Sequence, residues 1–402
     1  MSRYRLDPTS EQEELLFGHC AHARFVWNLA VEQQGWWSRF RGRAPGFAEQ
    51  CRQLTEARAA FGWLAAGSVT VQQQALRDFN QAMANFFAGT HRRPTWRKAG
   101  LHEGFRQVGL KPHQVRRLSR RWGAVQVPKV GWVRFRMSRP VPEGVKSYRV
   151  TRDRAGRWHV AFAHVPDLVP GPGNGAVAGV DRGVTVAAAT SAGDLLRVPG
   201  LTPGESRRLG LLRRKLSRAK PGGRRRARLK AAIARLMARQ ADRRKNWVEQ
   251  TSTALARSFD VIGVEDLDIR AMTASARGTL ERPGRNVRQK AGLNRGILAS
   301  GWGLLVARLE HKAPGRVVRI DPAYTSQRCS LCGVVDREAR ESQARFRCRS
   351  CGHAGNADVN AARNIAHAAR QSASAAGPAV AARGRPGVSG RTNREPQLVL
   401  LS

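Results

Sequence analysis

Acidic residues are scarce in this sequence of 402 residues. It contains 29 Asp and Glu against 71 Lys and Arg, so its formal net charge at pH 7 is +42. A folded chain with that charge repels itself unless a polyanion neutralises it, which predicts nucleic acid as the partner. An anionic membrane surface is the competing interpretation. However, no apolar run reaches the length of a bilayer span, and the most basic stretch, 207–245, has no aromatic anchor.

Cysteine is also rare, but its placement is informative. Four of the six cysteines form two Cys-x-x-Cys pairs with fifteen residues between them. These are Cys329, Cys332, Cys348 and Cys351. The spacing is typical of a zinc ribbon, in which four thiolates bind one Zn²⁺ and replace a core that so short a segment cannot build. Two disulfides would need an oxidising compartment, and the N-terminus does not resemble a signal peptide. The other two, Cys20 and Cys51, are predicted to be reduced thiols of a cytoplasmic protein.

The first part of the sequence changes from a helical pattern to a strand pattern. Residues 7–11 predict a capped helix start, and residues 69–87 keep one helical face apolar. In the helix predicted at 69–87, glutamines 72–74 fan around the axis, and we interpret them as solvated positions rather than nucleic-acid contacts. From about 125 to 165 every second residue tends to be apolar, as in a β-strand with one buried face. This pattern predicts a small antiparallel sheet closed into a barrel with a basic outer face.

The second part begins after a segment rich in Pro and Gly, 169–175, which predicts the main domain boundary. Within the basic stretch, Leu and Ile residues recur at helical spacing and form an apolar seam on one face. This seam favours two folded helices, and the charge around it favours helices that lie along phosphates. Its residues predicted to contact nucleic acid are Arg213, Arg214, Lys215, Arg224, Arg225 and Arg226. The final stretch, 371–402, has no period and is predicted to be disordered.

Three acids stand where a catalytic metal site would need them. Asp181 and Glu265 each end a short apolar strand, and Asp358 begins a helix just beyond the cysteines. Converging carboxylates repel one another, so such a cluster implies divalent cations. Two Mg²⁺ ions about 4 Å apart could activate a water and stabilise the leaving oxygen of a phosphodiester. Each acid alone is weak evidence, because an Asp after a strand more often caps a turn.

Several polar residues near these acids have two interpretations. Arg363 and Asn364 lie on the helix that Asp358 begins. In one interpretation they hold the metal-binding acids in place or contact a substrate phosphate, and in the other they are only solvent-exposed polar residues of the helix. Asp266 could be mistaken for a ligand because it follows Glu265 directly. Thr325 is predicted to brace the first pair of cysteines rather than to act as a nucleophile, because no His lies near it in sequence.

Four motifs follow one another along the chain. They are Gly179-Val180-Asp181-Arg182-Gly183, Val264-Glu265-Asp266-Leu267, Tyr324-Thr325-Ser326-Gln327-Arg328-Cys329-Ser330-Leu331-Cys332-Gly333 and Asp358-Val359-Asn360-Ala361-Ala362-Arg363-Asn364-Ile365. In order and spacing they closely resemble the TnpB family, the OrfB-type proteins of bacterial insertion sequences, which are relatives of the miniature type V CRISPR effectors. The resemblance covers nearly the whole chain. One departure is Asn356, where relatives often carry Asp.

The resemblance implies an RNA-guided DNA endonuclease that uses a two-metal, RuvC-like mechanism and is associated with transposon maintenance. Asp181, Glu265 and Asp358 match the family's metal-binding acids. The implied cofactors are structural Zn²⁺, catalytic Mg²⁺ and a guide RNA, and the implied partner is double-stranded target DNA, with no membrane and a monomeric protein. A transposase that acts directly in strand transfer, and a non-catalytic RNA- or DNA-binding regulator, are the alternative functions.

The implied fold is a multidomain α+β structure with an RNase H-like (RuvC) α/β nuclease domain that contains an inserted zinc ribbon. The predicted domains are a wedge-like β-barrel at 1–8 and 113–170, a helical recognition lobe at 9–112, the nuclease domain at 175–321 and 355–370, the ribbon at 322–354 and the disordered tail at 371–402.

Overall fold

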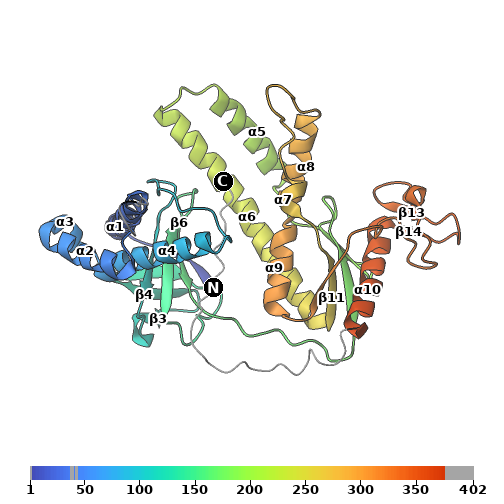
Figure 1. The fold of residues 1–402 in the computed structure, drawn as a ribbon, viewed down its shortest axis with the longest axis horizontal. Coiled ribbons are helices and arrows are strands. Elements are labelled where there is room, and N and C mark those ends of the chain that lie inside the picture. The colour runs from blue at the N-terminus through green and yellow to red at the C-terminus, as the bar shows by residue number, and fades with distance from the viewer. Residues whose placement is uncertain (1, 37–39, 41–43, 376–402) are drawn as a thin grey trace. The chain divides into compact units, whose positions relative to one another are not determined.

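The protein divides into two compact units. One contains residues 1–166 and 201–239, and the other contains residues 167–200 and 240–402. The structure, a computed structural model, describes residues 2–36, 40 and 44–375 (Figure 1). The predicted joint at 169–175 lies just beyond the first division, whereas the return of residues 201–239 to the first unit was not expected from the sequence. The finer domain limits given above stay a prediction.

A seven-stranded antiparallel sheet organises the first unit, as the period-two pattern predicted. The strands are β1 (Ser2–Asp7), β2 (Gly104–Val108), β3 (Val115–Arg117), β4 (Trp122–Val127), β5 (Gly131–Arg136), β6 (Ser147–Arg152) and β7 (Trp158–Phe162), in the order β2-β6-β7-β1-β5-β4-β3. Among the described residues no pairing joins the edge strands β2 and β3, so the sheet is not closed into the expected barrel. The rings of Tyr4, Phe135 and Phe162 meet in its core, with centroids 5.3 to 5.8 Å apart.

Four helices accompany this sheet. They are α1 (Ser10–Gly35), α2 (Phe47–Ala60), α3 (Gly62–Ala66) and α4 (Val69–Phe87). Helix α1 begins at the predicted place, because Thr9 and Gln12 form a capping box. The apolar stripes of α1 and α4 are buried against each other, and the Trp27 and Phe79 rings meet edge to face at 5.4 Å. The apolar helical face predicted at 69–87 is therefore core.

The prediction that glutamines 72–74 are solvated is wrong for two of the three residues. Gln72 is fully buried, and Gln74 is buried as well, whereas Gln73 is exposed. The Gln72 amide donates to the carbonyl of Leu64 in α3 and accepts from the Arg58 guanidinium of α2. Helices α2 and α3 supply these partners, so the amide is satisfied away from water.

The basic stretch forms two helices, as its apolar seam predicted. Helix α5 (Pro203–Ser217) begins with a capping box between Thr202 and Glu205, and α6 spans Arg224–Ser258. Leu209 of α5 and Leu236 of α6 are buried, although charged residues surround them in sequence. Burial of these apolar residues thus stabilises the two helices despite their high charge.

A five-stranded mixed sheet organises the second unit. The strands are β8 (Val177–Asp181), β9 (Ala188–Thr190), β10 (Leu195–Leu196), β11 (Val261–Glu265) and β12 (Val317–Ile320), in the order β10-β9-β8-β11-β12. Strands β8, β11 and β12 run parallel, whereas β9 and β10 are antiparallel to their neighbours. The central strands β8 and β11 are the two that end in the acids singled out above.

Helices cover both faces of this sheet. Helix α9 (Trp302–Lys312) and the C-terminal part of α6 pack on one face, and α10 (Ala357–Ala375) packs on the other (Figure 1). The approach of α10 is close because β8 and β11 present glycines to it. A Cβ atom on Gly179 would lie 1.9 Å from the carbonyl oxygen of Ala362, and one on Gly263 would lie 2.7 Å from the Cβ of Ala369. Only glycine fits at these two positions.

The remaining elements of this unit connect the sheet to α10. They are α7 (Ile269–Met272), α8 (Val287–Ser300), a short 3₁₀ turn at Arg337–Ala339, and the hairpin strands β13 (Arg345–Arg347) and β14 (Ala354–Asn356). Of the tail predicted to be disordered, residues 371–375 belong to α10, and residues 376–402 lie outside the described part. No helix of the described chain combines the length and apolar character that crossing a bilayer requires.

Candidate functional site

The parallel strands β8 and β11 bring Asp181 and Glu265 to the same place. Their register sets Gly179 opposite Gly263 and Val180 opposite Val264, so the two acids are the next positions along. Side chains alternate along a strand, and the two glycines face α10. Asp181 and Glu265 are therefore directed to the face of the sheet that α10 covers.

The third acid, Asp358, lies in the first turn of α10 and is buried. The Asn356 side chain caps this turn, because its Oδ1 accepts from the backbone N–H groups of Asp358 at 3.0 Å and Val359 at 3.1 Å. An Asp side chain would accept the same two bonds, so the departure from the family pattern preserves the cap.

The three acids influence one another electrostatically. Burial, followed by the negative charges of Glu265 and Asp358, raises the pKa of Asp181 to about 7. Within the described residues, the four cysteines are the one group of three or more potential metal ligands whose donor atoms all lie within 4.8 Å of one another. The oxygens of the three acids therefore do not all come within that distance of one another. Oxygen ligands of this kind suit Mg²⁺, and a cation would relieve the repulsion that raises the Asp181 pKa.

An arginine that sequence reasoning missed also lies at this site. Arg340 donates from Nη2 to Oδ1 of Asp358 at 3.0 Å and to the carbonyl of Gln343. Gln343 in turn donates to the Thr185 hydroxyl, which follows β8, at 3.2 Å. No spacing rule links Arg340 to an acid 18 positions away, so only the folded loop reveals this pair.

Two further groups hold Glu265. The Thr325 hydroxyl donates to Oε1 of Glu265 at 2.7 Å, and the Arg182 guanidinium donates to the backbone carbonyl of Glu265. Thr325, Glu265 and Arg182 are all buried. The sequence had predicted a bracing role for Thr325 beside the first cysteine pair, and its contact with Glu265 was not expected.

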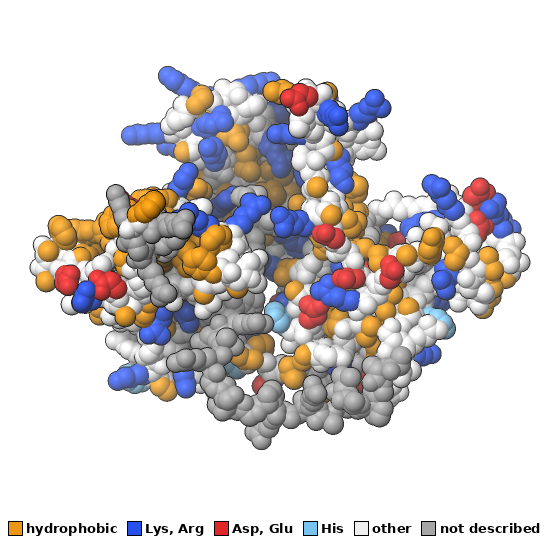
Figure 2. Space-filling view, viewed as in Figure 1, with side chains coloured by type: hydrophobic (Ala, Val, Ile, Leu, Met, Phe, Trp, Pro, Cys, Tyr) orange, Lys and Arg blue, Asp and Glu red, His pale blue; other side chains and the backbone are white. Residues whose placement is uncertain are grey.

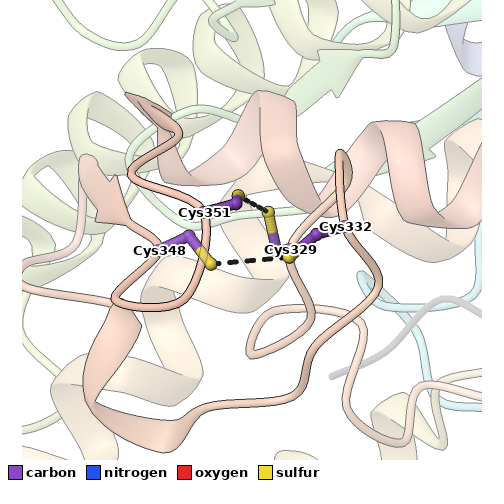
Figure 3. A group of neighbouring side chains, drawn as sticks. All are labelled: Cys329, Cys332, Cys348 and Cys351. Carbon is purple, nitrogen blue, oxygen red and sulfur yellow. Dashed lines mark hydrogen bonds between the residues drawn. The ribbon is translucent and has the colours of Figure 1, made fainter.

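The four predicted zinc ligands converge, and their sulfur atoms point toward one another (Figure 3). The Sγ–Sγ distance is 3.7 Å from Cys329 to Cys351 and 3.7 Å from Cys332 to Cys348. Four thiolates about 2.3 Å from a tetrahedral Zn²⁺ lie about 3.8 Å apart, whereas a disulfide needs about 2.05 Å. The donor set therefore fits zinc and excludes two disulfides. Cys20 and Cys51 are free thiols of the first unit, and burial raises the pKa of Cys20.

The polar residues of α10 bind the loop that leads into the cysteines. Asn364 donates to the backbone carbonyls of Thr325 at 2.9 Å and Arg328 at 2.7 Å. Asn360 donates to the same Arg328 carbonyl and accepts from the N–H of Ser330. Arg363 is exposed. The Asn364 amide thus braces protein backbone, and a nucleic-acid contact for Arg363 or Asn364 stays a prediction.

The residues predicted to contact nucleic acid on α5 and α6 differ in what they bind. Arg213, Arg214, Lys215, Arg224 and Arg225 are exposed. Arg226 is half-buried and donates to the carbonyls of Leu216 and Ala219, so it closes the turn between the helices. Figure 2 shows Lys and Arg side chains projecting from this helical hairpin at the top of the view. Contact with nucleic acid stays a prediction for all six.

Three family models match parts of the chain. A helix-turn-helix domain model matches residues 2–42, a model described as "Probable transposase" matches residues 159–276, and a Cas12f1-like TNB domain model matches residues 302–365. The second segment contains Asp181 and Glu265, and the third contains Asp358 and all four zinc-ligand cysteines.

Two relatives match nearly the full length. The "Putative RNA-guided DNA endonuclease InsQ" of Escherichia coli strain K12 is 34% identical over 97% of this chain and 95% of its own. A "Putative RNA-guided DNA endonuclease" of Streptomyces pristinaespiralis is 31% identical over 98% and 96%. Among solved structures, a Cas12f1–sgRNA–target DNA complex superposes with a TM-score of 0.56 at 13% identity over 89% of this chain and 83% of that one, which shows a shared fold.

Proposed function

The chain belongs to the TnpB family, the OrfB proteins of IS605-type insertion sequences, and on that premise we propose that it is an RNA-guided DNA endonuclease encoded by an insertion sequence. Its proposed role is the cleavage of phosphodiester bonds in double-stranded DNA chosen by a guide RNA. The names of the two full-length relatives support this activity.

One observation carries the proposal for the site: two acids end adjacent parallel strands and face the helix that begins with the third. We propose Asp181, Glu265 and Asp358 as the catalytic acids. The raised pKa of Asp181 supports it, because carboxylates held close enough to perturb one another are characteristic of catalytic sites.

The reaction is proposed to depend on metal ions that these acids would hold. Bound Mg²⁺ would supply activation of a water and stabilisation of the leaving oxygen. The chain's own groups have separate tasks. The three carboxylates provide the oxygen ligands, Thr325 and Arg182 fix Glu265 from two sides, and Arg340 supplies positive charge beside Asp358.

The proposed partners are a guide RNA and target DNA. One solved structure that shares the fold of this chain is a complex of Cas12f1 with sgRNA and target DNA. The net charge of +42 supports a partner with many phosphates, and the exposed basic residues of α5 and α6 are the proposed contacts. In such complexes base pairing reads sequence, while the protein binds the shape of the duplex.

We propose that the second sheet with its helices is the RuvC-like, RNase H-like nuclease domain at 175–321 and 355–370, with the zinc ribbon at 322–354 inserted between its second and third acids. The strand order, with two parallel strands on one side of β8 and an antiparallel pair on the other, supports this assignment. The first unit would supply the wedge at 1–8 and 113–170 and the recognition lobe at 9–112.

A guided cleavage assay tests the function. The protein is expressed with its native flanking sequence, the RNA that copurifies is sequenced, and DNA matching that RNA is incubated with the complex in Mg²⁺. We expect cleavage by the unmodified complex and none by Asp181→Ala. Glu281→Gln, which changes an exposed carboxylate, is the control and should cleave normally.

The same assay separates the alternatives. Joining of DNA ends without guided cutting would favour a transposase, the activity in the description of the matching family model. Bound RNA without any DNA cleavage would favour a non-catalytic regulator. Guided cleavage that survives Asp181→Ala would refute the proposed site.

A further inference from the structure

A single hydroxyl connects the zinc ribbon to the proposed catalytic glutamate. Thr325 lies between β12, which pairs with the strand that ends in Glu265, and Cys329, the first zinc ligand. Its Oγ1 lies 2.7 Å from Oε1 of Glu265 and 3.0 Å from the carbonyl of Pro322. A hydroxyl has one hydrogen to donate. The carboxylate is the closer and more strongly attracting acceptor, because it carries a charge.

The backbone around Thr325 is fixed independently of that hydrogen bond. The preceding residue, Tyr324, has a φ of 61° in the left-handed region, which is unusual for a residue with a side chain. Its carbonyl accepts from the N–H groups of Gln327 and Arg328, which close the turn. Asn364 of α10 then binds the carbonyls of Thr325 and Arg328. The hydroxyl therefore approaches Glu265 from a rigid support.

The same support includes the turn that carries the first cysteine pair, Cys329 and Cys332, which we call the first zinc knuckle. Asn360, which is 2% exposed, donates to the Arg328 carbonyl and accepts from the Ser330 N–H, so it brackets Cys329. Asn360 and Asn364 lie on α10, whose first turn carries Asp358. Two of the three acids are consequently tied to one loop, Asp358 through its helix and Glu265 through Thr325.

We propose that Thr325 is a positioning residue: its hydroxyl holds the Glu265 carboxylate in the orientation that binds a divalent cation, and it makes that orientation depend on the first zinc knuckle. The inference deepens the proposed nuclease function and rests on it. A hydrogen bond to the second oxygen of a ligating carboxylate restricts rotation of the group, and loss of such partners typically lowers metal affinity or activity roughly 10- to 100-fold.

The test compares Thr325→Val, which keeps the shape of the side chain but removes the hydroxyl, with Thr325→Ser, which restores the hydroxyl. The neighbouring Ser326→Ala controls for changes in the loop. Each RNA-bound complex is titrated with Mn²⁺ by calorimetry, its zinc content is measured, and guided cleavage is timed. We expect Thr325→Val to weaken Mn²⁺ binding by roughly 10-fold or more with full zinc content, and Thr325→Ser and Ser326→Ala to behave like the unmodified complex.

The outcomes separate this inference from the proposed function. Mn²⁺ binding by Thr325→Val that matches the unmodified complex would overturn the positioning role. Equal losses in Thr325→Val and Ser326→Ala, or loss of zinc from Thr325→Val, would mean that the hydroxyl only maintains the loop, and would overturn it as well. If the unmodified complex neither binds Mn²⁺ nor cleaves, the nuclease function itself fails, and the inference falls with it.

Discussion

Replacement of Asp181 with Asn should stabilise the metal-free protein while it abolishes cleavage. The pKa of Asp181 is raised from 3.8 to about 7 by burial and by Glu265 and Asp358. Because the folded state holds this proton more tightly than the unfolded state, folding stability falls as pH rises from about 4 to about 7, and the whole penalty is present above pH 7. Asn carries no charge and escapes the penalty.

The size of the effect follows from the shift. Each pKa unit corresponds to about 1.4 kcal/mol, so the change from 3.8 to about 7 sets an upper limit of about 4 kcal/mol at pH 8. Asp181 is only half-buried, and water screens part of this energy. We expect Asp181→Asn to raise the local folding stability at pH 8 by about 1.4 to 2.8 kcal/mol. This gain corresponds to a local opening equilibrium constant about ten- to a hundredfold smaller.

Hydrogen exchange of the peptides that cover β8 and β11 is the suitable assay, because a chain with two units does not unfold in one step. The buffer is freed of Mg²⁺ by dialysis, since a strong chelator would also remove zinc. Exchange in Asp181→Asn should be slower at pH 8, and most of this difference should vanish at pH 4.5. Added Mg²⁺ should favour the unmodified chain, which alone keeps all three proposed ligands.

Two results would refute this reasoning. An unchanged or faster exchange in Asp181→Asn at pH 8 would show that the acids do not repel one another in the fold. A gain of equal size at pH 4.5 and pH 8 would show that packing, and not charge, causes it. The exposed Glu281→Gln serves as the control and should leave exchange of both strands unchanged.

Three further predictions follow from other parts of the chain. The unmodified protein should contain about one zinc per chain, and Cys348→Ser should lose it in elemental analysis; full zinc in that variant would rule out the site. Arg213→Gln combined with Arg225→Gln should reduce the salt dependence of RNA binding by about one logarithmic slope unit per charge; an unchanged slope would argue against phosphate contacts. Gly179→Ala should destabilise the structure around β8 by about 3 kcal/mol, because its methyl group would meet the backbone of α10. Gly210→Ala, in open space on α5, should stabilise that helix by about 0.5–1 kcal/mol. Hydrogen exchange of the peptides that cover β8 and α5 would measure both, and tolerance of Gly179→Ala would contradict the close approach.

Features encoded in short stretches of sequence could be predicted. The capping box at Thr9, the seam of α5 and α6, and the convergence of the four cysteines each depend on spacing that a local element fixes. The acids were found because each stands at an element's end beside a recognisable pattern. Their catalytic role stays a prediction.

The parts that could not be predicted depend on partners brought together by tertiary packing. Gln72 looks like a surface residue until α2 and α3 cover it. The bond from Thr325 to Glu265 joins residues 60 positions apart, and nothing in the sequence near either one indicates it. Closure of the predicted barrel likewise depends on whether two edge strands meet, which alternation within each strand does not determine.

The glycines under α10 have a consequence for how copies of such genes should be judged. Gly179 and Gly263 perform no chemistry, yet they set how closely the helix with Asp358 can approach the other two acids. A drifting copy could keep every acid and every cysteine and still be inactive through one added methyl group. A survey that infers activity from the acids alone would count such copies as intact, so these two positions belong among the criteria for a working copy.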